Sequence, residues 1–216
     1  MTLEKPRYIV VEGPIGVGKT SLATRLADSL SSALVLERPE DNPFLERFYQ
    51  DPRSGALPAQ LFFLFQRARQ LEDQQQHDLF KAVRVADFMI EKDRLFAELT
   101  LDVAEWQLYQ QIYNHLDIRP PRPDLVIYLQ APVQALVERV RKRGIPYEQT
   151  IQKRYLERLM EAYARFFHQY DESPLLIVNT GDIDPINNES DYRALLEQIN
   201  GVHSGRHFYN PVSRIA

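Results

Sequence analysis

Short apolar runs recur along the 216-residue chain, and stretches with helical spacing separate them. Loop signals or helical patterns bound each run, as expected of strands buried on both faces of a sheet. The predicted strands are Tyr8–Glu12, Ala33–Glu37, Val83–Asp87, Leu125–Leu129 and Leu175–Asn179. The predicted helices are Thr20–Ser31, Leu57–Gln76, Glu91–His115, Pro132–Arg143, Thr150–Tyr170 and Ser190–Asn200. This alternation predicts an α/β fold in three layers, with a parallel sheet between helices.

The loop after the first strand has a specific phosphate-binding pattern. It matches G-x-x-x-x-G-K-[ST] and stands between a strand and a helix, as a P-loop requires. Its residues are Gly13, Pro14, Ile15, Gly16, Val17, Gly18, Lys19 and Thr20, followed by Ser21. Glycines let backbone N–H groups turn toward a phosphate, and the helix N-terminus adds partial positive charge. We therefore expect a P-loop NTPase-type fold that binds ATP, with Lys19 on the β- and γ-phosphates and Thr20 on Mg²⁺.

Two carboxylates end the next two predicted strands, at the edge where such sheets bind ligands. Glu37 is placed to act as a base toward an acceptor hydroxyl, although it also suits a helix cap or a solvated position. Asp87 is placed to hold Mg²⁺, directly or through water, and the alternative is a cap for the following helix.

Arginines cluster at the end of the helix predicted over Pro132–Arg143. Arg139, Arg141 and Arg143 precede a Gly-Ile-Pro loop, and arginine suits bidentate contacts to phosphate. Such residues could form a cationic lid over the donor phosphates, or simply a solvated face near a helix C-terminus. The Gly181–Ile186 segment is either a turn or a backbone cradle for the nucleotide base.

Composition limits the remaining classes of partner. The net charge of −4 gives no electrostatic reason to expect a nucleic-acid polymer. The chain has no cysteine, so a disulfide and a thiolate metal site are excluded. No run of 18 apolar residues and no signal-peptide pattern occurs, so we expect no membrane association and a cytoplasmic location. The length predicts one domain over residues 1–216.

Together these residues resemble the deoxynucleoside kinase family, and most closely its bacterial deoxyadenosine/deoxyguanosine kinase-like branch. Beyond the P-loop, the resemblance rests on Leu36–Leu45, Phe48–Pro52, Leu57–Gln60, Ala86–Phe96, Arg139–Glu148 and Asn179–Asp184. It covers nearly the whole chain. The order and spacing of Glu37, Tyr49 and Gln60 are more specific to the family than the P-loop is.

The resemblance implies a role for each matching residue. Glu37 would take the proton from the 5′-hydroxyl of a deoxyribonucleoside, while Tyr49 and Glu148 would bind its 3′-hydroxyl. Gln60 would bind the base edge through its amide. Arg139, Arg141 and Arg143 would form a lid at about residues 139–149, and Asp182 to Ile186, with Asp182 and Ile183 foremost, would contact the donor base. A five-stranded parallel sheet and a homodimer are also implied.

One departure from the family pattern affects the catalytic site. Animal members carry Glu-Arg-Ser where this chain has Ala86-Asp87-Phe88, so the usual arginine beside the catalytic glutamate is absent there. Asp87 could supply the Mg²⁺ carboxylate, and Arg38 or Arg67 could supply the missing positive charge. Arg67 and Lys92 are also donors that favour a purine base.

The sequence therefore predicts ATP-dependent phosphorylation of a deoxyribonucleoside 5′-hydroxyl, with a preference for purines. The nearest alternative is a nucleoside-monophosphate kinase of the thymidylate kinase type, which needs further cations for the acceptor's own phosphate. A nucleotide-gated switch is a third possibility, but neither DxxG nor NKxD of a GTPase is recognised in the sequence.

Overall fold

A parallel sheet forms the centre of the protein, whose computed structural model describes residues 8–77 and 83–211. Within these residues the sheet has six strands in the order β2-β3-β1-β4-β5-β6. Every neighbouring pair runs parallel. The strands are β1 (Tyr8–Glu12), β2 (Ala33–Val35), β3 (Arg84–Ala86), β4 (Leu125–Gln130), β5 (Leu175–Asn179) and β6 (Arg206–Tyr209). β1, which leads into the P-loop, therefore lies in the interior of the sheet.

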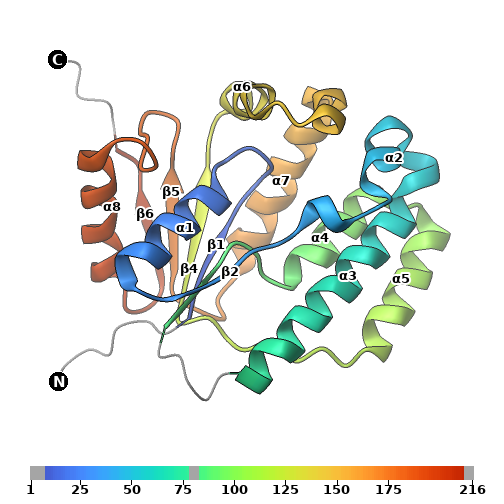
Figure 1. The fold of residues 1–216 in the computed structure, drawn as a ribbon, viewed down its shortest axis with the longest axis horizontal. Helices are drawn as coiled ribbons and strands as arrows, with labels where there is room; N and C mark the ends of the chain where they lie inside the picture. The colour runs from blue at the N-terminus through green and yellow to red at the C-terminus, as the bar shows by residue number, and fades with distance from the viewer. Residues whose placement is uncertain (1–7, 78–82, 212–216) are drawn as a thin grey trace.

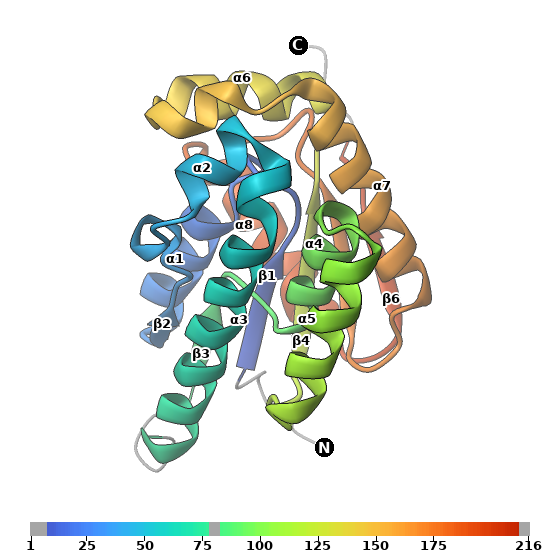
Figure 2. The same cartoon turned by 90° about the vertical axis from the view of Figure 1, so that its right-hand side faces the viewer.

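Helices cover both faces of this sheet. They are α1 (Lys19–Leu30), α2 (Leu45–Gln50), α3 (Pro52–His77), α4 (Glu91–Thr100), α5 (Val103–His115), α6 (Val133–Arg143), α7 (Lys153–Gln169) and α8 (Glu189–Gly201), with short 3₁₀ turns η1 (Pro39–Asp41) and η2 (Pro146–Thr150). α1 and α8 lie on one face, while α3, α4, α5 and α7 lie on the other (Figures 1 and 2). The result is the three-layer α/β arrangement that the sequence predicts.

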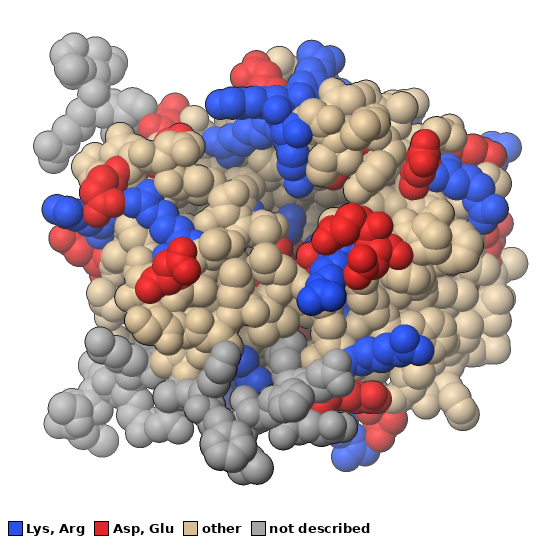
Figure 3. All heavy atoms as spheres, viewed as in Figure 1, with Lys and Arg blue, Asp and Glu red and all other residues tan. Residues whose placement is uncertain are grey.

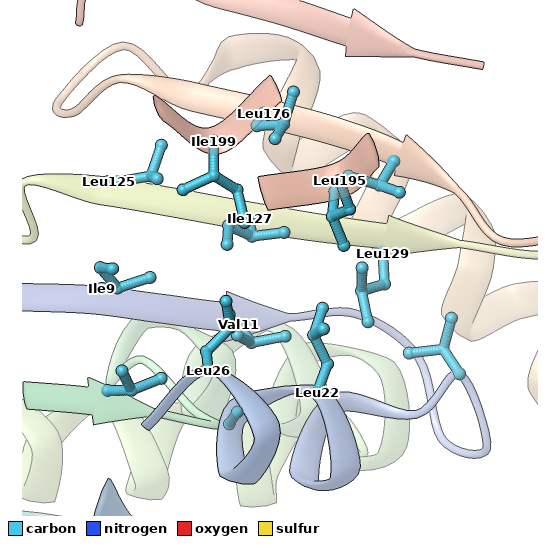
Figure 4. Packing of buried hydrophobic residues seen from close by; sticks show 14 of the residues in the cluster. Ile9, Val11, Leu22, Leu26, Leu125, Ile127, Leu129, Leu176, Leu195 and Ile199 are labelled. Atoms are coloured by element: carbon cyan, nitrogen blue, oxygen red, sulfur yellow. The ribbon is translucent and has the colours of Figure 1, made fainter. Parts of the chain in front are cut away.

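The alternation of β1 side chains explains why both faces are covered. Ile9 and Val11 pack in the core beneath α1 and α8, together with Leu22 and Leu195 (Figure 4). Val10 points to the opposite face, into a second core that includes residues of α4 and α7. Each fully buried side chain of this size stabilises the fold by roughly 1.5–3 kcal/mol, which fixes β1 and hence the loop that follows it.

Two features of the predicted elements are corrected by the structure. The described sheet has six strands rather than five, because the segment Arg206–Tyr209 pairs with β5. That edge strand has three exposed residues and no apolar run, so its sequence does not indicate a buried strand. The single helix predicted over Glu91–His115 is two helices, α4 and α5. Asp102 and Glu105 form a capping box that starts α5 and thereby ends the continuous helix.

Several smaller differences concern element ends. The six-residue helix α2 follows η1, in a stretch to which the sequence assigned no element. The helix predicted over Thr150–Tyr170 starts at Lys153, after η2. The ends of the domain predicted over 1–216 lie outside the described residues, as does the last part of the tail. Within the described part of the chain, no helix is both long and apolar enough to span a membrane.

The carboxyl ends of the strands define the functional edge of the molecule. α6 crosses above this edge, and α2 stands beside it (Figures 1 and 2). The P-loop, Glu37 and Asp87 follow β1, β2 and β3, so the order β2-β3-β1 brings all three to one place.

Candidate active site

The P-loop is held in a conformation that glycine permits. Gly13 and Gly16 have φ angles of 149° and 82°, in the region that other residues rarely adopt. A side chain at Gly13 would place its Cβ 2.5 Å from the Leu129 carbonyl oxygen, and one at Gly16 would lie 2.9 Å from that of Leu136. Close packing against β4 and α6 thus fixes the loop whose backbone N–H groups are available to a phosphate.

Lys19 and Thr20 begin α1 directly after this loop. The Lys19 ammonium donates to the Pro14 carbonyl oxygen at 3.2 Å, folding the side chain over the loop. Burial, and then the nearby Lys92, lowers the pKa of Lys19 to about 8. A lysine in this state gains from a bound polyphosphate, which would restore its full positive charge.

Asp87 links the P-loop to the end of β2. Its Oδ2 accepts a hydrogen bond from the Thr20 hydroxyl at 2.5 Å, and its Oδ1 accepts one from the backbone N–H of Glu37 at 2.8 Å. The carboxylate and hydroxyl oxygens are hard ligands of the kind Mg²⁺ prefers, so the pair fits a site completed by phosphate oxygens and water. Among the described residues, no cluster of three His, Cys, Asp or Glu side chains forms a metal site alone.

Glu37 lies between two buried cations. Its Oε2 accepts from the Lys92 ammonium at 2.6 Å, and its Oε1 pairs with the Arg67 guanidinium. Burial alone would raise the pKa of Glu37, but Arg67 and Lys92 outweigh it and hold the value well below its usual range. The carboxylate is therefore ionised across the physiological pH range.

Two cations contact Glu37, although this chain lacks the arginine of the Glu-Arg-Ser motif. Arg67 on α3 and Lys92 on α4 both contact Glu37, whereas Arg38 is exposed and forms no ion pair with Glu37 in the described part of the chain. Lys92 also has a raised pKa because Glu37 outweighs the effect of burial. The contacts that the sequence assigned to a purine base are, in this structure, contacts to the carboxylate.

A cavity of about 110 Å³ opens beside Glu37, and we call it the acceptor cavity. Its lining includes the residues assigned to nucleoside binding: Glu37, Tyr49, Gln60, Arg67, Asp87, Lys92 and Glu148. Phe48, Phe63 and Phe96 add apolar walls suited to a flat ring. Tyr49 stacks on Tyr147 with ring centroids 6.1 Å apart. Burial, with Tyr155 and Glu148, raises the pKa of Tyr49 well above 10, so its hydroxyl remains a hydrogen-bond donor.

A larger cavity of about 980 Å³ lies on the other side of the P-loop, and we call it the donor cavity. Gly16, Val17, Gly18, Lys19, Thr20 and Ser21 line it, as do Asp182 and Ile183 from the loop after β5. Gly13, Pro14 and Ile15 are not among its described lining residues, since they form the earlier part of the loop. Lysine and arginine side chains of α6 gather above a hollow in this surface (Figure 3).

The three arginines of α6 occupy different environments. Arg139 donates to the Val17 carbonyl oxygen at 3.4 Å and to the Thr180 carbonyl oxygen at 2.8 Å, so it ties α6 to the P-loop and to the end of β5. Arg143 pairs with Glu148 at 2.5 Å and lines both cavities. Arg141 is exposed and is absent from the described linings of the donor and acceptor cavities.

Two buried acids support the site without a role assigned from the sequence. Glu12, at the end of β1, accepts from the Tyr163 hydroxyl at 2.7 Å and from the backbone N–H of Met89 at 3.1 Å. Asp93 is fully buried and its Oδ1 lies 2.5 Å from Nη1 of Arg67, while Glu37 contacts the other terminal nitrogen, Nη2. In the sequence, Asp93 stands out only as an acid next to Lys92 near a helix start. Its partner Arg67 is revealed only by the packing of α3 on α4.

The two cavities meet at the P-loop. Gly16, Lys19, Thr20 and Arg143 line both, whereas Glu37 lines only the acceptor cavity among the described residues. A phosphate bound at Lys19 is therefore open to a group held beside Glu37. This geometry suits transfer of a phosphoryl group from a nucleotide in one cavity to a hydroxyl in the other.

Comparisons with known proteins agree with this chemistry. A family model described as deoxynucleoside kinase matches residues 9–203. The deoxyguanosine kinase of Bacillus subtilis (strain 168) is 38% identical over 197 residues, covering 89% of this chain and 95% of that protein. The deoxyadenosine/deoxycytidine kinase of the same strain is 28% identical, covering 93% of this chain and 94% of that protein. The solved structure of deoxyadenosine kinase from M. mycoides with bound dATP has a TM-score of 0.76 at 24% identity, covers 90% of this chain and 99% of that chain, and shares the fold.

Proposed function

The chain belongs to the deoxynucleoside kinase family, and from this premise we propose that it transfers the γ-phosphoryl group of ATP to the 5′-hydroxyl of a purine deoxyribonucleoside. The observation that carries the proposal is the meeting of the donor and acceptor cavities at Lys19 and Thr20, with Glu37 on the acceptor side. The products are ADP and the deoxynucleoside 5′-monophosphate.

On the donor side, the P-loop backbone and Lys19 bind the β- and γ-phosphates. Asp182 and Ile183, which line the donor cavity, contact the base of ATP. Thr20 and Asp87 would hold Mg²⁺, which would supply positive charge to the phosphate oxygens. Arg143 adds a cation at the boundary between the cavities, where charge develops during transfer.

On the acceptor side, Glu37 receives the hydrogen bond of the 5′-hydroxyl. A carboxylate with so low a pKa is a weak base. Phosphoryl transfer through a loose transition state needs little proton removal before the bond to phosphorus forms, so Glu37 orients the hydroxyl and accepts its proton late. Tyr49 and Glu148, which line the same cavity, bind the 3′-hydroxyl.

The preference for a purine is supported by the relatives. The B. subtilis protein that is 38% identical to this chain is a deoxyguanosine kinase. Another relative, 28% identical, is named for both deoxyadenosine and deoxycytidine. Adenine and cytosine both carry an amino donor next to a ring-nitrogen acceptor, whereas guanine carries a carbonyl acceptor next to an N–H donor. Gln60, through its amide, is the residue of the acceptor cavity that reads this edge.

The segment from Arg139 to about residue 149 serves as a lid over the donor phosphates. Its cationic residues would exclude water, which otherwise competes with the nucleoside as acceptor. Arg139 already holds the start of this segment against the P-loop. The following part, with Arg141 and Arg143, is therefore the part that closes.

We also propose a homodimer within the cytoplasm. Large apolar side chains are exposed on α3 and α5, namely Phe65 at 44%, Val103 at 77% and Leu108 at 45%. Burial of such side chains against a second copy would stabilise the pair. Sedimentation equilibrium should give about twice the 25.3 kDa of one chain, and a mass of one chain at micromolar concentration would contradict the dimer.

The test of the proposed function is ATP consumption with Mg²⁺ against a panel of acceptors. The panel contains the four deoxynucleosides, their ribo counterparts and their 5′-monophosphates. We expect turnover with deoxyguanosine or deoxyadenosine, and little with any monophosphate. Turnover with monophosphates alone would contradict the roles of Glu37 and Tyr49 and indicate a nucleoside-monophosphate kinase.

A further inference from the structure

We propose that Thr100 fixes which end of the Gln60 amide is the donor and which is the acceptor, and thereby selects between 6-keto and 6-amino purines. The inference rests on the proposed function, in which Gln60 contacts the base. Thr100 is the last residue of α4, and Gln60 lies on α3, which packs against α4.

The observation is a chain of two hydrogen bonds behind the acceptor cavity. The Gln60 Nε2 group donates to the Thr100 hydroxyl oxygen at 3.3 Å. The Thr100 hydroxyl in turn donates to the Phe96 carbonyl oxygen at 2.7 Å. Gln60 is 3% exposed, so its amide has few other partners to exchange with.

Which atom donates in each of these two hydrogen bonds follows from the protons available. A threonine hydroxyl has one proton, and a carbonyl oxygen can only accept, so the proton of Thr100 is used on Phe96. The hydroxyl can then only accept from Gln60, which requires an N–H there rather than the amide oxygen. To turn the amide over, the hydroxyl would have to give up the Phe96 carbonyl. With the hydroxyl proton on the Phe96 carbonyl, the amide N–H of Gln60, and not its oxygen, faces Thr100.

A fixed amide discriminates between two kinds of base edge. At the 6-position and N1, guanine and hypoxanthine present an acceptor and then a donor, while adenine presents a donor and then an acceptor. An amide whose oxygen and N–H cannot exchange places matches one order and opposes the other. An opposed pair leaves buried polar groups unsatisfied, which is the most effective way for a site to reject an analogue.

Thr100 acts as a positioning residue. It is absent from the described lining of the acceptor cavity and instead lines a separate cavity behind it, of about 460 Å³. The contact that its hydroxyl makes to another side chain is the one with Gln60, so we expect its effect on the nucleoside to pass through Gln60. This separates Thr100 from Gln60 in an experiment, because loss of the hydroxyl leaves the contact residue itself intact.

The experiment measures kcat/KM for deoxyinosine and deoxyadenosine, which differ only in the order of donor and acceptor at the 6-position and N1. Thr100→Val keeps the shape but removes the hydroxyl, and Thr100→Ser keeps the hydroxyl as the matched control. We expect the ratio of the two kcat/KM values to move toward one by roughly threefold to tenfold in Thr100→Val, because the freed amide can serve either base. Thr100→Ser should keep the ratio of the unmodified protein. Thermal unfolding checks each variant, and Thr100→Ala replaces the valine variant if that one does not fold.

Gln60→Ala distinguishes failure of this inference from failure of the proposed function. We expect it to lower kcat/KM for both nucleosides by roughly tenfold to a hundredfold. If Gln60→Ala is impaired but Thr100→Val keeps the ratio unchanged, the orienting role of Thr100 is wrong while the base contact stands. If Gln60→Ala keeps the kcat/KM of the unmodified protein for both nucleosides, Gln60 does not contact the base. The proposed role of Thr100 is then also wrong.

Discussion

At the scale of single residues, the site depends on charges that are buried next to one another. Glu37 and Asp93 supply two negative charges, and Arg67 and Lys92 supply two positive ones, so the cluster is close to neutral. Burial raises the pKa of Asp93 to about 6, even though Arg67 opposes the rise. Glu37, with cations on both of its oxygens, remains the strongest acid of the cluster.

Lys19 leads to a prediction about pH. With a pKa of about 8, close to half of the Lys19 side chains are uncharged at pH 8 in the nucleotide-free protein. Bound phosphates favour the charged form, so binding of Mg²⁺–ATP at pH 8 should take up ~0.5 proton per nucleotide, and ~0.1 proton at pH 7. Affinity should accordingly weaken as pH rises above 8.

Calorimetric titration in two buffers with different ionisation enthalpies measures this uptake. The observed heats should differ between the buffers at pH 8 and nearly coincide at pH 7, and the same protein at the lower pH is the control. Equal heats at pH 8 would show that Lys19 is already fully charged before the nucleotide binds.

The sequence was most informative where a residue type and its spacing imply a chemical role. Lys19 and Thr20 follow from the P-loop pattern, and Glu37 and Asp87 from their places at strand ends. The pairing of Glu37 with both Arg67 and Lys92 could not be read from the chain, because the three residues come from separate elements. Asp93 and Thr100 act behind residues that line the cavity, and such supporting contacts leave no local pattern.

At the scale of elements, Arg139 attaches helix α6 to the P-loop, while Arg141 nearer its C-terminal end is exposed. Arg139 donates to the Thr180 carbonyl and reaches the P-loop, whereas Arg141 is exposed and is absent from the described linings of both cavities. Arg139→Ala leaves buried carbonyl groups without this donor and should lower the Tm by roughly 2–8 °C. Arg141→Ala, two residues along the same helix, should change the Tm by no more than ~1 °C.

Differential scanning calorimetry of the two variants tests this difference. Arg141→Ala is the matched control, since it removes the same side chain from the same helix. Equal Tm losses in the two variants would mean that the loss of a positive charge near the C-terminus of α6, and not the loss of the Arg139 contacts, lowers the stability of this segment.

Element boundaries show where hydrophobic pattern stops being informative. The five apolar strands were all predicted, because each carries an apolar run, including the partly exposed edge strand β2. The break between α4 and α5 was missed, although the Asp102-x-x-Glu105 capping box was visible in the sequence. β6 was missed for a different reason: an exposed edge strand needs no apolar run, and its backbone pairing with β5 comes from tertiary structure.

At the scale of the whole molecule, the donor and acceptor cavities are parts of one continuous site. Gly16, Lys19, Thr20 and Arg143 belong to both linings, so a ligand that occupies both sides would pass directly over the P-loop. Joining two ligands makes the second binding event intramolecular, and the gain depends on whether the linker spans the distance.

This continuity predicts tight binding of adenosine joined through its 5′-phosphates to deoxyguanosine. A bridge of four or five phosphates should span the site and bind at least ~100-fold more tightly than ATP or deoxyguanosine alone, within the usual range for linked ligands. Binding to the folded state alone should then raise the Tm beyond the effect of both separate ligands at the same concentrations. The same compound with two phosphates is the control, because a bridge too short for both cavities keeps only one of the two binding contributions. Isothermal titration and thermal unfolding with both compounds would check this, and equal affinities for the long and short bridges would mean that the two cavities are not filled at the same time.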